Sequence, residues 1–429
     1  MKTNVFSRWA GVFVLGSIGA MPAWGVDAAP AFNPEQHAVI STDRPDGRYV
    51  ATRGIVQEML RKKPLLSFDP SFTPQQFAAW KETVKAMLRK EVLAFPDLPP
   101  APPAKRLSAE KRDGYTLEKW EHYPMSGAVV PFLMLVPDGV TEKTPAPAVL
   151  CLPGTNRTKE SLAGEPERHP FFAVPRFEKE NGMALQYAKA GIVAVAVDNP
   201  GFGELSDLEV ASGQRYLSHN EVQTFGHHLF NLGWSYMGYA AYVADRLLVC
   251  MRHDARIDRR RLATSGHSLG AWLAGYLAVL NDDLAAAVMN QGIYSWREAA
   301  KTMTRPAKNG RRPQTLGALF FIPGLYRFFD HPDIQAALAP RPALYSEGLP
   351  ERDLQTIYRP AYAISGAPEN LTVVQFEKYR NPSSRHNGDV PEGIGSLDEL
   401  WRYYSNDAPQ HYFKGEAAVP WLKNVLGVR

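Results

Sequence analysis

The chain has 429 residues, of which 45% are apolar and 21% are charged, so it can bury a large core and is neither a disordered nor a fibrous protein. Its formal net charge of +4 gives no reason to expect a nucleic-acid partner. The densest basic run, residues 259–261, directly precedes an apolar segment and is interpreted as a solvated strand entry.

The first 25 residues are predicted to be a secretory signal peptide. Lys2 and Arg8 form a basic start, residues 9–21 are apolar and rich in small side chains, and residues 23–25 offer a small-x-small cleavage site. The apolar run is too short to span a bilayer, and no later run reaches the ~20 apolar residues that a span needs. We therefore expect an exported protein, periplasmic or secreted, without a stable membrane span after signal removal. A membrane-tethered N-terminus is the alternative.

Two cysteines, Cys151 and Cys250, could pair in an oxidising compartment or remain as two buried thiols. Neither has metal-ligand spacing. The adjacent pair His227 and His228 is a poor metal site because neighbouring residues rarely face one ion, and no carboxylate cluster adjoins them. We predict no metal and no other cofactor. The oligomeric state is left open.

Residues 26–110 are expected to form an N-terminal extension with one clear helix. Thr73 can cap this helix, Pro74 suits its first position, and Gln76 completes a capping box. Apolar residues then recur at helical spacing, at positions 77, 80, 84, 87 and 88. Five prolines between positions 96 and 103 form a stiff link to the next region.

Residues 111–429 are predicted to form a catalytic domain with a mainly parallel sheet flanked by helices. Two leading strands are followed by alternating strands and helices, and the segment 148–152 is apolar throughout, as in a strand buried on both faces. The predicted strands are 115–122, 129–136, 148–152, 192–197, 262–264, 285–289, 342–345 and 371–376. The predicted helices are 183–190, 233–252, 269–280, 397–404 and 417–426.

The segment from Gly266 to Gly270 matches the pattern G-x-S-x-G, with Ser268 at its centre. It lies between a β-type run and an apolar helix, where a nucleophile elbow must lie. Glycine on both sides removes side chains that would clash in so sharp a turn. Ser268 is therefore predicted to be a nucleophile. The alternative is a structural turn with an incidental serine.

An oxyanion hole is expected beside this serine. One donor would be the Leu269 N–H, and the other would come from the loop after the strand that ends at residue 152. Pro153 has no N–H and Gly154 permits a close approach, so Thr155 is the predicted second donor. A plain strand-ending turn is the alternative.

From residue 115 onward the chain resembles the dienelactone hydrolase and acetyl xylan esterase branch of the α/β-hydrolases. The resemblance rests on ordered segments at residues 152–154, 159–160, 198–203, 257–258 and 339–342. It implies the α/β-hydrolase fold and hydrolysis of an ester through an acyl-enzyme, without a metal. Glucuronoyl esterases look similar but carry Arg after the serine, where this chain has Leu269. Asp198 is interpreted as part of a structural turn that is common to the fold.

The resemblance also implies the order serine, acid, histidine, with the acid after the strand 342–345. Relatives place the acid three residues after a glycine that ends this strand, which selects Glu351 after Gly348. Asp353 is a close rival, and Glu347 is the third candidate, although it could still belong to the strand.

The histidine must follow the strand 371–376, which leaves His386 and His411. His411 begins an H-x-F segment just before the last predicted helix, as in the family, and it is the preferred base. This choice makes residues 387–410 an insertion. His386, ten residues past the strand, is the alternative.

Two long segments, about residues 205–231 and 292–339, should overhang the site, and both carry many aromatic residues. These side chains could stack on a sugar or aryl ester, or they could form the small core of a lid. The favoured function is an esterase acting on acetylated or otherwise esterified carbohydrate. A peptidase or amidase with the same triad and a non-catalytic binding protein of the same fold are the alternatives.

Overall fold

The computed structural model describes residues 52–97, 102–155, 157–166, 182–206, 219–291, 295–303, 318–391, 394 and 397–428. The chain separates into two compact units, residues 1–56 and 57–429, and the sheet belongs to the second. The predicted signal peptide and the start of the N-terminal extension lie outside the described residues. Within the described ranges, no helix is both long enough and apolar enough to cross a membrane.

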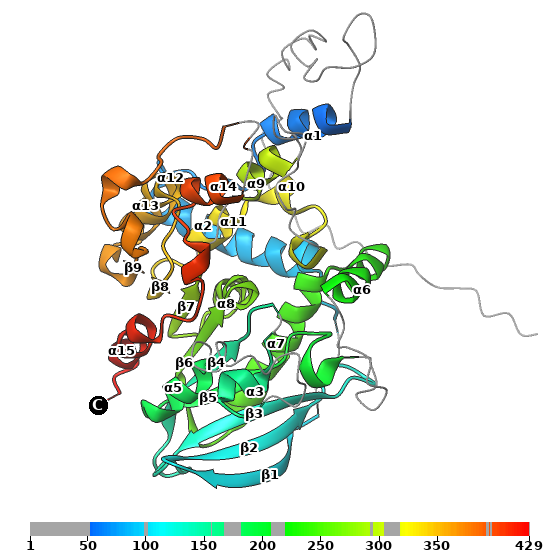
Figure 1. Cartoon of the computed structure of the whole chain (residues 1–429), viewed down its shortest axis with the longest axis vertical. Coiled ribbons are helices and arrows are strands. Elements are labelled where there is room, and N and C mark those ends of the chain that lie inside the picture. Colours follow the sequence, from blue (N-terminus) through cyan, green and yellow to red (C-terminus); the bar gives the residue numbers. More distant parts are fainter. Residues whose placement is uncertain are drawn as a thin grey trace, which may run out of the picture. The chain divides into compact units, whose positions relative to one another are not determined.

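Nine strands in the described part of the chain form one sheet, in the spatial order β1-β2-β3-β5-β4-β6-β7-β8-β9 (Figure 1). The first four strands of that order pair antiparallel, and every later pair is parallel. This confirms the predicted mainly parallel sheet. The strands are β1 (Lys105–Arg112), β2 (Tyr115–His122), β3 (Val130–Pro137), β4 (Ala146–Leu152), β5 (Val193–Val197), β6 (Ile257–His267), β7 (Ala286–Asn290), β8 (Ala343–Tyr345) and β9 (Leu371–Val373).

Helices cover both faces of this sheet (Figure 1). The helices of the described residues are α1 (Thr52–Arg61), α2 (Pro74–Met87), α3 (Lys159–Ala163), α5 (Met183–Lys189), α6 (His219–Asn231), α7 (Tyr236–His253), α8 (Leu269–Leu280), α9 (Trp296–Met303), α10 (Leu325–Phe328), α11 (His331–Ala336), α12 (Glu351–Asp353), α13 (Arg359–Ile364), α14 (Leu397–Tyr403) and α15 (Gly415–Val425). Short π-type and 3₁₀ turns, such as η1 (Leu88–Val92) and η5 (Leu354–Tyr358), join some of them.

The two hydrophobic cores follow from the alternation of side chains along the strands. In β4, Ala148 and Leu150 belong to the core on the side of α2, α7 and α8, whereas Val149 and Cys151 belong to the core on the side of α5 and α15. Successive residues of a strand point to opposite faces, so a strand buried on both sides must be apolar throughout. This explains why β4 could be recognised from its sequence.

The predicted helix of the N-terminal extension is α2, and its capping box is formed by Thr73 and Gln76. Phe77, Trp80 and Val84 are its buried residues, and the Trp80 indole donates to the Leu66 carbonyl at 3.0 Å.

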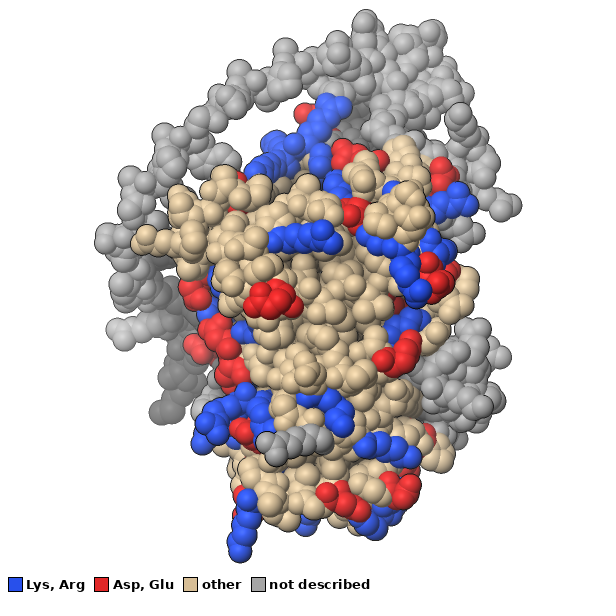
Figure 2. Space-filling view, turned by 90° about the vertical axis from the view of Figure 1, so that its left-hand side faces the viewer, with Lys and Arg blue, Asp and Glu red and all other residues tan. Residues whose placement is uncertain are grey.

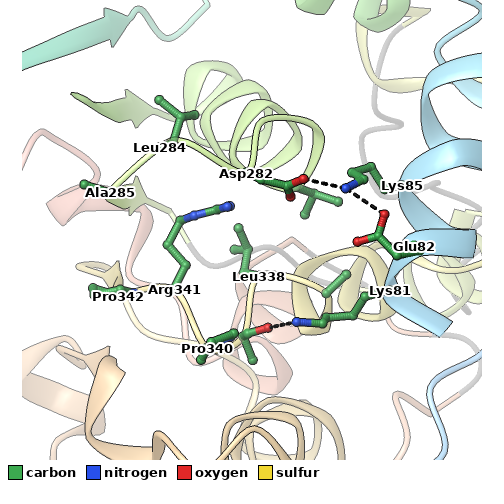
Figure 3. Close-up of a pocket in the computed structure, with 13 residues that line it drawn as sticks. Lys81, Glu82, Lys85, Asp282, Leu284, Ala285, Leu338, Pro340, Arg341 and Pro342 are labelled. Atoms are coloured by element: carbon green, nitrogen blue, oxygen red, sulfur yellow. Dashed lines mark hydrogen bonds and ion pairs between the residues drawn. The ribbon is translucent and has the colours of Figure 1, made fainter. Parts of the chain in front are cut away.

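Polar contacts join α2 to the amino edge of the sheet around a cavity of about 410 Å³ (Figure 3). Lys81 Nζ donates to the Ala339 carbonyl at 2.7 Å, and Lys85 Nζ lies between Asp282 and Glu82. We interpret this cavity as a structural joint, because the cations in it already have partners.

Two details differ from the sequence expectations, and a third was left open by the sequence. β1 begins at Lys105, so the boundary expected near residue 110 falls within the first strand of the sheet. β9 ends at Val373, three residues before its expected end, whereas β8 ends at Tyr345 as expected. Cys151 and Cys250 are both free thiols and are not joined by a disulfide bond.

Figure 2 shows the face on the left-hand side of Figure 1, where basic and acidic side chains are interspersed and the middle carries few charges. Neither sign of charge gathers into a continuous patch on this face. The view is consistent with the small net charge of +4.

Candidate active site

Ser268 lies in a sharp turn between β6 and α8. Its backbone has φ 54° and ψ −120°, a region that non-glycine residues rarely adopt and that is typical of a nucleophile elbow. Every other residue from Leu262 to Leu280 is buried, whereas Ser268 is half-exposed. The strained turn therefore brings this one side chain to the surface of an otherwise buried strand–turn–helix unit, at the N-terminus of α8, where the helix dipole favours negative charge.

The two glycines of the motif are required by close packing. A Cβ on Gly266 would overlap the backbone of Gly270, and a Cβ on Gly270 would overlap the carbonyl group of Leu152. The elbow thus packs directly on the end of β4, which is the strand that leads into the expected oxyanion loop.

That loop lies against the serine. A Cβ built on Gly154 would lie 3.0 Å from the Cβ of Ser268, so a larger residue could not approach as closely. The Asn199 amide holds the loop by donating to the carbonyls of Pro153, at 2.9 Å, and Gly154, at 3.3 Å. Thr155, the predicted oxyanion donor, is half-buried and directly follows Gly154. Leu269, the other predicted donor, is the first residue of α8.

His411 forms a close pair with a carboxylate, and that carboxylate belongs to Glu347. His411 Nδ1 lies 2.7 Å from Glu347 Oε2, and the Tyr412 N–H donates to Glu347 Oε1 at 3.1 Å. The Glu347 side chain is almost fully buried and that of His411 is 28% exposed. With its Nδ1–H donated to the carboxylate, His411 keeps its Nε2 as an acceptor, as a general base requires.

Glu351, the residue predicted from the family spacing, makes different contacts. Its two carboxylate oxygens accept from Gln355 at 2.7 Å and from Arg385 at 2.6 Å. The difference arises because β8 ends at Tyr345, so Glu347 already lies beyond the strand, while Glu351 lies in α12. The rival Asp353 is buried and bound by Arg352 at 2.9 Å. Of the three candidate acids, Glu347 is the one that contacts a histidine in the described residues.

The alternative base, His386, is exposed and stacks on Tyr403, with ring centroids 4.6 Å apart. The described contacts of this ring include no carboxylate, and it lies in a surface loop. The structure therefore pairs His411, rather than His386, with an acid.

Asn290, at the end of β7, connects three parts of the site, and sequence reasoning did not single it out. Its backbone carbonyl accepts from the Ser268 N–H at 3.2 Å. Its side chain donates to the Tyr412 carbonyl at 3.0 Å and accepts from the Lys414 N–H at 2.6 Å. The Ser346 hydroxyl donates to the same amide oxygen at 2.7 Å. A polar residue ending the apolar strand β7 was the available signal.

His267, which precedes Ser268, packs against His411. Its ring centroid lies 4.5 Å from that of His411, with 33° between the planes. Burial, followed by the charge of His411, holds the pKa of His267 well below its ordinary value, so this ring is neutral.

The ligand atoms of His267, Glu347 and His411 lie within 4.8 Å of one another, which is the spacing of a possible metal site. The two imidazole rings pack on each other at a tilt of 33°, with their centroids 4.5 Å apart. Both oxygens of Glu347 also accept hydrogen bonds already. The arrangement fits an oriented histidine better than a metal centre.

Asp198 belongs to a second charged cluster at the same edge of the sheet. Its carboxylate accepts from the backbone N–H groups of Lys159, at 2.7 Å, and Glu204, at 3.2 Å. The fully buried Lys159 ammonium contacts three carboxylates: Asp198 at 2.8 Å, Glu204 at 2.8 Å and Glu160 at 3.0 Å. These contacts are consistent with the predicted structural role of Asp198.

Two of the aromatic residues expected on the rim, Tyr216 and Tyr294, lie outside the described residues. Those that are described pack on other side chains. Phe320 contacts Trp272 with ring centroids 5.7 Å apart, and Tyr326 contacts Trp296 at 5.6 Å. These contacts favour the interpretation as the core of a lid over the interpretation as free stacking surfaces.

Comparison with known proteins agrees with this fold. A family model described as the Abhydrolase family matches residues 31–424. The chain therefore belongs to the α/β-hydrolase family, as its sequence predicted. No curated protein matches the chain at comparable significance.

A solved structure with substantial similarity is that of a candidate acetyl xylan esterase from Bacteroides fragilis, at 38% identity and a TM-score of 0.81. The match covers 92% of this chain and 100% of that one. A glucuronoyl esterase from Solibacter usitatus matches at 16% identity and a TM-score of 0.47, over 71% of this chain and 86% of that one. At that level the second likeness carries no functional argument. Neither likeness tests the resemblance to dienelactone hydrolases.

Proposed function

We propose that this protein is a serine esterase that hydrolyses carboxylic esters, with acetyl or similar esters of carbohydrates as its substrate class. The observation that carries the proposal is the 2.7 Å contact between His411 and Glu347, formed next to an elbow that presents Ser268. Its further support is the 38% identity to a candidate acetyl xylan esterase.

In the proposed mechanism, His411 Nε2 accepts the proton of the Ser268 hydroxyl while the oxygen attacks the ester carbonyl. Glu347 accepts the Nδ1–H of His411, which fixes the tautomer and stabilises the imidazolium that forms. The imidazolium then protonates the leaving alcohol, and an acyl-enzyme remains. Water, deprotonated by the same histidine, releases the acid and restores the serine.

The negative charge of each tetrahedral intermediate would be held by the N–H groups of Leu269 and Thr155. The packing of Gly154 on Ser268 supports this assignment, because it keeps the loop within reach of the serine. A donor of this kind is typically worth about 10²–10³ in turnover. The mechanism uses side chains and backbone groups of the chain itself and invokes no metal or cofactor.

The proposed setting is outside the cytoplasm, in the periplasm or the medium, because the first 25 residues have the layout of a signal peptide. Mass spectrometry of the mature N-terminus tests this proposal. Cleavage after about residue 25 would support it, and a mature protein that retains residues 1–25 would contradict it.

The test of the function is turnover across a panel of acetylated sugars, glucuronate methyl esters, aryl esters and peptide amides. Acetylated sugars are expected to have the highest kcat/KM. Amide turnover at comparable efficiency would instead indicate a peptidase or amidase. A folded protein without turnover of any ester would indicate a binding protein that kept the fold.

A further inference from the structure

A cavity of about 830 Å³ lies between the last turns of α7 and the antiparallel strands β1 to β3. This volume is in the range of small-molecule sites. One end is lined by Asp254 and Arg256, just before β6, whereas Ser268 follows the other end of that strand. The 11 residues of β6 extend over roughly 30 Å, so this end of the cavity is remote from the candidate active site.

Arg246 brings an unsatisfied guanidinium to this cavity. Its Nε and Nη2 are buried and have no hydrogen-bond partner among the described residues. The other two arginines of the lining differ, because Arg256 binds Glu118 and Asp254, and Arg106 also binds Glu118. Buried donor atoms of a cation are costly when they lack an acceptor, so an anion that entered the cavity would be stabilised there.

His122 is a second unsatisfied group beside the cavity. It is fully buried, and neither ring nitrogen has a partner in the described residues. Its ring centroid lies 6.0 Å from that of Phe132, which lines the cavity. Burial, followed by the charge of Arg246, lowers the pKa of His122 to about 3. The ring is therefore neutral, with one N–H to donate and one nitrogen to accept.

Flat apolar surfaces lie near these polar groups. Trp120 and Phe132 line the cavity and stack on each other, with centroids 6.1 Å apart and 15° between the planes. Val249 and Met251 of α7 also line it. Aromatic side chains of this kind favour a ligand that contains a ring over a small inorganic ion.

We propose that this cavity binds a small carboxylate carried on an aromatic or sugar ring, with Arg246 holding the carboxylate and the Trp120–Phe132 wall packing on the ring. A planar guanidinium suits a carboxylate because it can donate two parallel hydrogen bonds. The site does not depend on the proposed esterase activity, since it shares no residue with the triad.

The smaller cavity beside α2 supports the assignment by contrast (Figure 3). It also contains three cationic side chains, but each donates to an acceptor that the chain itself supplies. Lys81 binds Ala339, Lys85 binds Asp282 and Arg341 binds the Ala278 carbonyl.

Cys250 provides a reporter for this site. It lines the cavity and is half-buried, whereas Cys151, the other cysteine of the chain, is fully buried in β4. A bound ring should therefore slow alkylation of Cys250 by iodoacetamide, which peptide mass spectrometry measures directly.

The test combines this labelling with calorimetric titration of the full-length protein. Benzoate and glucuronate represent the two ring types, and benzamide is the uncharged match of benzoate. We expect one or both carboxylates to bind with a Kd below about 1 mM and to protect Cys250, and benzamide to bind at least about tenfold more weakly. Arg246→Gln should weaken carboxylate binding at least about tenfold. Arg252→Gln should not, because Arg252 lies on the same helix but binds Asp283 outside the cavity.

Binding by benzoate alone would identify the ligand class as aryl acids, and binding by glucuronate alone would identify it as sugar acids. The proposal is overturned if neither carboxylate binds or protects Cys250 at up to about 10 mM, or if Arg246→Gln binds as tightly as the unaltered protein. If Arg246→Gln does not fold, Arg246→Lys and the labelling of the unaltered protein still decide the question.

Discussion

The loops after β4 and β5 carry buried carboxylates, and so does the loop after β8, but the two regions hold them differently. In the first region, three carboxylates surround Lys159, a cation that stays protonated at neutral pH. In the second, Glu347 faces the single imidazole ring of His411. The difference shows that a buried acid at the active edge is informative only together with its partner.

The same comparison distinguishes a structural ion cluster around Lys159 from the pair of His411 and Glu347, which is proposed to be catalytic. Burial would lower the pKa of Lys159, but its three carboxylates outweigh it and raise the pKa above the ordinary value. Such a cluster locks two loops in place and offers no acceptor for a substrate proton. His411, with one nitrogen committed to Glu347, retains the other for chemistry.

Replacing the nucleophile should have the largest effect. Ser268→Ala is expected to lower kcat on nitrophenyl acetate by about 10⁴-fold or more, because no acyl-enzyme can form. Thermal unfolding should change little. The matched control is Ser383→Ala, at an exposed position, which should keep full activity. Retention of more than a few per cent of the activity in Ser268→Ala would show that Ser268 is not the nucleophile.

Replacing the base should have a similar effect. We expect His411→Ala to lose about 10⁴-fold in kcat and His386→Ala to lose less than about twofold. The reason is that His386 lies exposed on Tyr403, whereas His411 meets the buried carboxylate. A large loss in His386→Ala and a small loss in His411→Ala would instead identify His386 as the general base.

The choice of acid is tested by two glutamates that lie four residues apart. Glu347→Gln should reduce kcat by about 10²–10⁴ and alter the pH profile, since an amide cannot stabilise the imidazolium. Glu351→Gln should leave kcat within a few-fold and act on stability, because its carboxylate holds Arg385 and Gln355. Equal losses of kcat in both variants would contradict the assignment of Glu347.

Removing the cation of the Lys159 cluster should lower the stability of the protein much more than its catalytic rate. Lys159→Met is expected to lower the free energy of unfolding by about 3–5 kcal/mol, since it leaves buried carboxylates without their cation. Denaturant unfolding measures this loss, and activity per folded molecule should fall much less than in His411→Ala. A stable variant with abolished turnover would show that Lys159 takes part in the reaction.

The pH dependence of stability should show a smaller effect of the same cluster. Burial would raise the pKa of Glu204, but Lys159 and Lys119 outweigh it and lower the pKa to about 2. A carboxylate with a depressed pKa contributes stability that is present above its ordinary pKa, near 4.5, and is lost as the pH falls toward 2. Glu204→Gln should therefore flatten the acid limb of a plot of stability against pH. An unchanged limb would show that Glu204 is not held by its lysines.

The elements that follow from local patterns could be predicted from the sequence. The motif around Ser268 and the apolar helix after it placed the elbow, because the glycines and the buried helix are local requirements. The apolar run of β4 and the capping box of α2 were recognisable for the same reason. His411 was selected through a family resemblance and not through a physical pattern of its own.

The parts that depend on tertiary contacts were not predictable. The exposed residues of β1 give no alternating pattern, so that strand was assigned to the extension. The acid was placed at Glu351 by counting from Gly348 as in the family, whereas the contact of Glu347 with His411 joins residues 64 positions apart and leaves no local pattern in the sequence. Asn290 and Arg246 belong to no motif, and their roles are visible only from their neighbours.

The junction at Asn290 has a consequence for how such a site can change. One residue holds the serine turn, the acid loop and the histidine loop, so a substitution there would disturb all three together. An engineer who wishes to redirect the protein toward another ester should therefore leave this residue alone. Substitutions away from Ser268, Ser346, Tyr412 and Lys414 would leave the partners of the Asn290 hydrogen bonds unchanged.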